Sequence, residues 1–118
     1  EFKLENSKIC LSGFSQGCMM SINLGLTSNK KYSCIVGFSG KIIDQENLRS
    51  RKKNLTSVLL IHGEQDQIVH PNFMLEAKDF FIRNNIEVST YLIQKCDHHI
   101  PIEASSIALN YIFKKINS

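Results

Sequence analysis

Residues 13–17 read Gly-Phe-Ser-Gln-Gly, which has the G-x-S-x-G form of a nucleophile elbow. In such a turn a serine lies between a strand and a helix, and the glycines let the backbone bend sharply and neighbouring elements pack closely. The N-terminus of the following helix favours an oxyanion that develops beside the serine. Ser15 is therefore a candidate nucleophile. The plainer alternative is a glycine-rich turn in which Ser15 caps the helix.

A nucleophilic serine needs a histidine base, and the histidine needs an acid that fixes its tautomer. Asp66 follows an apolar run at residues 57–61 and could be that acid. Glu64 is a weaker candidate for the same role, and the plainer interpretation of Asp66 is a loop aspartate that accepts backbone N–H groups. His98 follows a later β-rich run, so the three residues occur in the chain order serine, acid, histidine.

The elements that must position these side chains alternate between short β-rich runs and helix-like stretches. The expected strands are residues 8–11, 34–38, 57–61 and 87–93, and the expected helices are residues 16–27, about 71–84 and 102–115. This alternation predicts an α/β fold, a mostly parallel sheet of about four strands flanked by helices. In such sheets functional groups gather in loops at the carboxyl ends of the strands, where all three candidates fall.

Composition limits the remaining function classes. The 118 residues are enough for one domain, 1–118, with a modest core, and the net charge of +3 is too small to indicate nucleic acid. No apolar stretch is long enough to span a bilayer. The basic residues within 41–54 predict a solvated loop or helix face. The four cysteines show no C-x-x-C or metal-ligand spacing, which indicates a reducing compartment, and we expect a cytoplasmic location.

Three motifs in order resemble the carboxylesterase/lysophospholipase family of α/β-hydrolases, which includes the acyl-protein thioesterases. They are Gly-Phe-Ser-Gln-Gly at 13–17, His-Gly-Glu-Gln-Asp-Gln-Ile-Val at 62–69 and His-His-Ile-Pro-Ile-Glu at 98–103. The resemblance implies a serine hydrolase with Ser15 as nucleophile, Asp66 as acid and His98 as base. It also implies an oxyanion donor at the backbone N–H of Gln16, no metal or organic cofactor, and a small-molecule, lipid or acyl-protein ester as substrate.

The chain departs from this pattern at three positions. Cys18 stands where a small residue is usual and could crowd the turn. His70 stands in place of proline, where a loop-capping role is expected rather than catalysis. Asp97 stands in place of the glycine before His98; it could compete with Asp66 for the ring and shift activity to higher pH by favouring the imidazolium.

The resemblance also implies strands that precede the elbow, so the sequence is expected to be the C-terminal portion of a longer hydrolase domain. A second oxyanion donor would come from one of those earlier loops. We therefore expect self-association or pairing with an N-terminal segment. One alternative is a catalytically incomplete remnant that acts as a folded interaction module. A flavodoxin-like binding domain is a further alternative, although no phosphate-binding loop is evident.

Overall fold

A computed structural model describes residues 8–117 of the chain. Strands and helices alternate along them, as the sequence predicts. The elements are β1 (Cys10–Phe14), α1 (Gln16–Thr27), β2 (Cys34–Phe38), α2 (Gln45–Arg51), β3 (Val58–Gly63), α3 (Asn72–Arg83), β4 (Val88–Ile93) and α4 (Ile102–Ile116).

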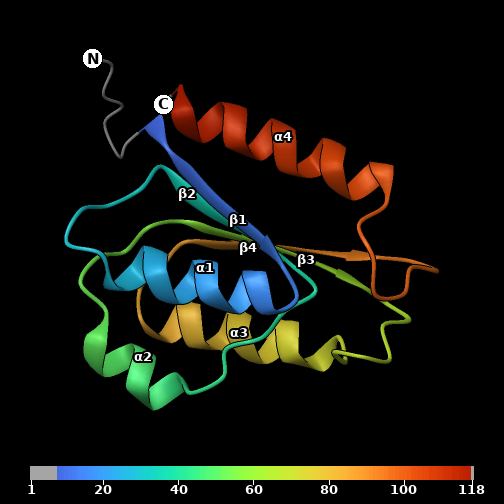
Figure 1. Cartoon of the computed structure of the whole chain (residues 1–118), viewed down its shortest axis with the longest axis horizontal. Coiled ribbons are helices and arrows are strands. Elements are labelled where there is room, and N and C mark those ends of the chain that lie inside the picture. The colour runs from blue at the N-terminus through green and yellow to red at the C-terminus, as the bar shows by residue number, and fades with distance from the viewer. Residues whose placement is uncertain (1–7, 118) are drawn as a thin grey trace.

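The four strands form one parallel sheet in the order β1-β2-β3-β4, so each strand pairs with its neighbour in the chain. Helix α4 covers one face of this sheet, and α1 and α3 cover the other, with α2 beside them (Figure 1). Parallel strands need crossover helices, and helices on both faces make the central strands apolar throughout. The expected α/β fold with a four-stranded parallel sheet is confirmed.

Side chains of the central strands point alternately to the two faces of the sheet and belong to two separate hydrophobic cores. On β3, Val58 and Leu60 pack with α1 and α3, whereas Leu59 and Ile61 pack with α4. All six residues of β3 and all five of β2 are buried. The two cores pack against both faces of the central strands. This packing also fixes the points at which the loops at their carboxyl ends begin.

The first strand lies later in the chain than expected. We predicted residues 8–11, but β1 is Cys10–Phe14. The reason is its parallel ladder with β2, which continues until Gly13 pairs with Gly37 and Phe14 with Phe38. The strand therefore runs directly into Ser15.

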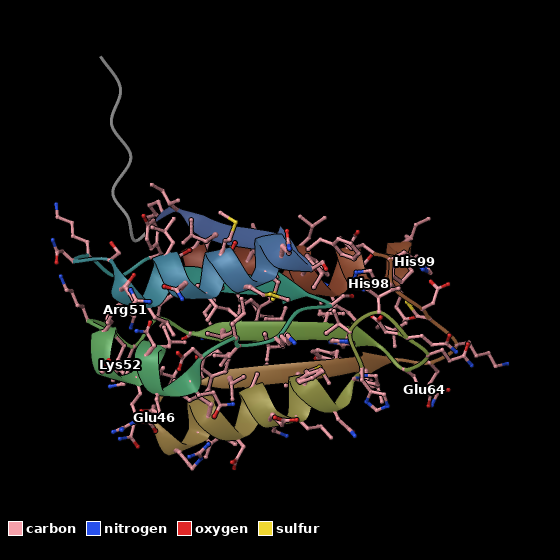
Figure 2. All side chains as sticks on the ribbon, turned by 60° about the horizontal axis from the view of Figure 1, so that its bottom comes forward. Glu46, Arg51, Lys52, Glu64, His98 and His99 are labelled. Atoms are coloured by element: carbon pink, nitrogen blue, oxygen red, sulfur yellow. The ribbon has the colours of Figure 1, made fainter. Side chains whose placement is uncertain are left out.

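The basic region within residues 41–54 forms the short helix α2, whose side chains are mostly exposed. Asp44 caps it by accepting the backbone N–H of Asn47 at 3.0 Å. Arg51 donates to the side chain of Asn23 on α1. Figure 2 shows Arg51 and Lys52 at the end of the molecule opposite to His98, so the C-terminal end of α2 lies far from the site described below. Within residues 8–117, no helix is long and apolar enough to cross a membrane.

Candidate active site

Ser15 lies in the turn between β1 and α1 with a strained backbone. Its φ of 57° and ψ of −115° place it in a region that L-residues rarely adopt. The Ser15 N–H donates to the Phe38 carbonyl at 2.8 Å, which holds the turn against the end of β2. Its side chain makes no capping hydrogen bond to α1. The hydroxyl is thus directed away from the helix that it precedes, in contrast to the plainer interpretation of this serine as a cap.

Glycine at position 13 is required by this turn. A Cβ at Gly13 would lie 2.1 Å from the carbonyl oxygen of Gly17, far inside van der Waals contact. The Gly17 position is different, because a Cβ there would meet nothing within 4 Å. The first glycine of the motif lets the helix start pack against the strand end, whereas the structure has room for a side chain at the second.

His98 joins the serine to the acid. Its Nε2 lies 3.1 Å from Ser15 Oγ, and its Nδ1 lies 2.7 Å from Asp66 Oδ2. A carboxylate can only accept, so Nδ1 carries a proton, and in the neutral form of the ring Nε2 presents its lone pair to the serine hydroxyl. The Phe14 ring lies against the imidazole with ring centroids 4.7 Å apart. The three residues that the sequence singles out therefore form one hydrogen-bonded chain.

Asp66 is buried with its carboxylate fully satisfied. Oδ1 accepts the backbone N–H groups of Ile68 at 2.9 Å and Val69 at 2.8 Å, which leaves Oδ2 for His98. Burial alone would raise the pKa of Asp66, but hydrogen bonds from His98, Val69 and Ile68 outweigh it and lower this pKa below its usual range. The acid is held as a carboxylate that stabilises a positive charge on His98.

The loops that carry Asp66 and His98 are bonded to each other. Glu64 N donates to Ile93 O at 2.9 Å, and Gln65 N donates to Cys96 O at 2.8 Å. A Cβ at Gly63 would lie 2.4 Å from the carbonyl oxygens of both Cys96 and Asp97, so only glycine allows this approach. The distance between acid and histidine is fixed by backbone contacts at the ends of β3 and β4.

The chain that carries this site matches the phospholipase/carboxylesterase family over residues 2–116. The chain belongs to that family. Acyl-protein thioesterase 1 of Yarrowia lipolytica is 28% identical over 117 residues, which cover 93% of this chain and 51% of the relative. Acyl-protein thioesterase 1 of Schizosaccharomyces pombe is 31% identical over 88 residues, which cover 72% of this chain and 39% of the relative.

Solved structures of other proteins have the same fold. The chain superposes on esterase PE8 with a TM-score of 0.90 at 30% identity, covering 94% of this chain and 52% of that one. Arabidopsis thaliana SOBER1 also gives a TM-score of 0.90, at 17% identity, which shows a common fold only. The chain thus spans about half the length of the relatives that it matches.

The family's usual small residue after the elbow is replaced by Cys18, and two glycines on β2 and the loop after it make room for it. A Cβ at Gly37 would lie 2.4 Å from Cys18 Sγ, and one at Gly40 would lie 2.5 Å from it. The thiol is buried, which raises the pKa of Cys18 to about 12. Cys18 is therefore an uncharged packing residue and does not crowd the turn.

The carboxylate of Asp97 is not the hydrogen-bond partner of the His98 ring. Its carboxylate pairs with Nδ1 of the neighbouring His99, while Nδ1 of His98 bonds to Asp66. The expected competition between Asp97 and Asp66 is absent from this structure, because the backbone directs the side chains of residues 97 and 99 toward each other. A longer-range effect of the Asp97 charge on pH dependence stays a prediction.

The remaining candidates from the sequence lie around this centre. Glu64 is exposed and its Oε1 accepts the N–H of Lys95, so it does not reach His98. His70 Nδ1 accepts the backbone N–H of Asn72 at 3.1 Å, the loop-capping role that we expected. Figure 2 shows Glu64, His98 and His99 at one end of the molecule.

A depression of about 900 Å³ opens over this end of the sheet. Its lining is polar, from residues 64–68, His70, Asp97 and His98. Within residues 8–117, no group of three or more His, Cys, Asp or Glu side chains is arranged to hold a metal ion. The arrangement suits a reaction carried by a nucleophile and a proton acceptor.

Sequence reasoning missed the part played by His62. This buried side chain has Nε2 2.7 Å from the Val69 carbonyl and 3.5 Å from Asp66 Oδ2. Since a carbonyl only accepts, Nε2 carries a proton and holds the turn whose N–H groups bind Asp66. Burial lowers the pKa of His62 and keeps the ring neutral. The sequence feature that could have indicated this role is the position of His62 at the end of β3, four residues before Asp66.

Proposed function

We propose that this chain hydrolyses carboxylic esters or thioesters through an acyl-enzyme on Ser15. The observation that carries the proposal is the position of His98, which lies within hydrogen-bond distance of both Ser15 Oγ and Asp66 Oδ2. An ordered serine, histidine and carboxylate with this connectivity is the arrangement that activates a serine hydroxyl as a nucleophile.

In the proposed reaction, Nε2 of His98 takes the Ser15 proton as Oγ attacks the carbonyl carbon of the substrate. The resulting imidazolium is stabilised by Asp66 and then protonates the leaving alcohol or thiol. A water molecule enters, His98 takes its proton, and hydroxide attack on the acyl carbon releases the acid and restores Ser15. No cofactor takes part in these steps.

The oxyanion needs donors beside Ser15. Gln16 is the first residue of α1, and the first N–H groups of a helix lack an acceptor within it. We assign the Gln16 N–H as one donor, aided by the positive end of the α1 dipole. Loss of a second donor costs about 3 kcal/mol of transition-state stabilisation, or roughly two to three orders of magnitude in rate.

We propose that the second donor and the missing pocket wall come from a partner segment, either an N-terminal hydrolase segment or a second copy of the chain. The relatives are about twice as long, and β1 is an edge strand in the described sheet. An edge strand offers unpaired backbone groups to another chain. On α1, which packs on β1, Met20 and Leu24 are 71% and 56% exposed and would contribute apolar surface to such an interface.

The relatives' names suggest the substrate class. Two of them are called acyl-protein thioesterases, and we propose that this chain acts on acylated proteins or on lipid and small-molecule esters. A cytoplasmic location is part of the proposal. It is supported by the four free cysteines, which are typical of proteins in a reducing compartment.

The test is intact-mass labelling of the chain with a fluorophosphonate, which modifies activated serines. A single adduct is expected, absent in Ser15→Ala and retained in Ser21→Ala, a matched control because Ser21 is a half-buried serine of α1, the helix that Ser15 precedes. Far-UV circular dichroism establishes that each variant is folded. A folded wild-type chain that gives no adduct would contradict an activated Ser15 and favour the interaction-module alternative.

A further inference from the structure

Two cysteines outside the site face each other across the first two strands. Cys10 on β1 and Cys34 on β2 are direct register partners, and their Sγ atoms lie 3.4 Å apart in a thiol–thiol hydrogen bond. We propose that Cys10 and Cys34 are a reversible oxidation site, at which a peroxide converts the two thiols to a disulfide that links β1 to β2.

The backbone geometry at this pair fits a disulfide. Adjacent strands lie about 4.8 Å apart, and disulfides need a Cα separation of roughly 4.4 to 6.8 Å. A disulfide bond is about 2.05 Å long, so side-chain rotation must bring the two sulfur atoms only about 1.4 Å closer. The bond can form without separating or shifting the strands.

The surroundings of the pair favour loss of one proton. The hydrogen bond shared with Cys10 is the main cause that lowers the pKa of Cys34 to about 7, and the Ser33 hydroxyl and the Lys115 charge act in the same direction. The same hydrogen bond raises the pKa of Cys10. These opposite shifts favour the thiolate at Cys34 and the thiol at Cys10.

Cys10 is the sulfur that a small oxidant can reach, because it is partly exposed while Cys34 is fully buried. As Cys10 sulfur attacks one peroxide oxygen, its proton passes to the Cys34 thiolate across the 3.4 Å contact, and the O–O bond breaks. Cys10 becomes a sulfenic acid, and the departing hydroxide takes up a proton to become water. Cys34 sulfur then attacks Cys10 sulfur; the S–S bond forms, the S–O bond breaks, and a second water leaves with the Cys34 proton. Two thiols and one peroxide give one disulfide and two waters.

The other two cysteines provide an internal control. Cys18 and Cys96 are buried, and each packs in its own environment: Cys18 against Gly37 and Gly40, and Cys96 with Sγ near the carbonyls of Asp97 and His99. Within the described residues, neither of these two thiols makes a hydrogen bond to another sulfur atom. Oxidation should therefore be selective for one pair among the four cysteines.

The experiment treats the 118-residue chain with one equivalent of hydrogen peroxide, blocks remaining thiols with N-ethylmaleimide under denaturing conditions, and maps cross-links by mass spectrometry. We expect two maleimide adducts where the reduced chain has four, one Cys10–Cys34 disulfide, and full reversal by dithiothreitol. Cys34→Ser should abolish the cross-link, and Cys18→Ala should retain it.

Three results would overturn the proposal. One is a stable sulfenic or sulfinic acid without a cross-link, and another is a disulfide that includes Cys18 or Cys96. The third is formation of the Cys10–Cys34 link at the same yield when peroxide is added in guanidinium chloride, since the fold would then contribute nothing. The mapping on the wild-type chain needs no substitution, so a poorly folding variant cannot obscure the result.

Discussion

His98 Nδ1 lies 2.7 Å from Asp66 Oδ2 although the two residues are 32 positions apart in the chain. The contact depends on two loops that are bonded backbone to backbone at the ends of β3 and β4. Because Oδ1 of the same carboxylate is occupied by two N–H groups, Asp66 cannot turn away from the ring. The consequence is a single tautomer of His98, with its basic nitrogen directed at Ser15.

Asp66→Asn tests this dependence. The amide would keep its oxygen on the N–H groups of Ile68 and Val69 and place its NH₂ toward His98, which stabilises the tautomer with a proton on Nε2. That ring cannot accept the serine proton, so the fluorophosphonate labelling rate should fall by about 10⁴-fold. The rate is measured by intact mass at several reagent concentrations. A variant that labels within about tenfold of the wild-type rate would show that Asp66 does not set the tautomer.

Two glycines of one pentapeptide should respond in opposite ways to the same substitution. Gly13→Ala places a methyl group 2.1 Å from a backbone oxygen, and we expect a loss of about 3 kcal/mol or more in the free energy of unfolding. The methyl group of Gly17→Ala would meet no atom within 4 Å. We therefore expect a gain of roughly 0.5–1 kcal/mol in the free energy of unfolding, because alanine loses less chain entropy than glycine when the helix forms. Urea unfolding followed by circular dichroism measures both. Equal effects of the two substitutions would mean that the strand-to-helix turn is not packed in this way.

The buried His62 predicts a pH-dependent stability. Its pKa is lowered in the folded chain, so the unfolded chain binds a proton more readily once the pH falls below about 6.5. Stability is therefore fully present above that pH and is lost as the pH falls toward the folded pKa, with a slope of at most about 1.4 kcal/mol per pH unit from this group. His62→Gln keeps a donor for the Val69 carbonyl and removes the titration.

The measurement is the free energy of unfolding in urea between pH 7.5 and 5.5 for the wild-type chain and His62→Gln. The variant should show a shallower decline than the wild-type chain over this interval. Parallel curves would mean that groups other than His62 cause the pH dependence of stability.

Much of this architecture could be predicted from local patterns. The bounds of α1 and β2 match the expected ranges residue for residue, because a helix that starts at an elbow and an apolar run between polar loops have clear ends. Ser15, Asp66 and His98 could be chosen because each follows a strand of a parallel sheet. The resemblance to the phospholipase/carboxylesterase family then implied the role of each residue.

Other features depend on contacts that the sequence does not display. The pairing of Asp97 with His99 follows from a loop conformation, and the fit of Cys18 depends on Gly37 and Gly40, which lie on another strand and its loop. Spacing along the chain also gave no indication that Cys10 faces Cys34, because only the strand register brings them together. Contacts between elements, together with the bounds of β1 and the short helix α2, were the part that local patterns did not predict.

The order of the strands in the sheet, which is also their order in the chain, bears on how the protein is made. During synthesis each new strand emerges when the neighbour that it joins already exists, so the sheet can grow from one side as the chain leaves the ribosome. Ser15 and Asp66 are made before β4, but His98 emerges only after β4 is complete. The hydrogen bonds that link Ser15, His98 and Asp66 therefore cannot form until the loop after β4 is in place.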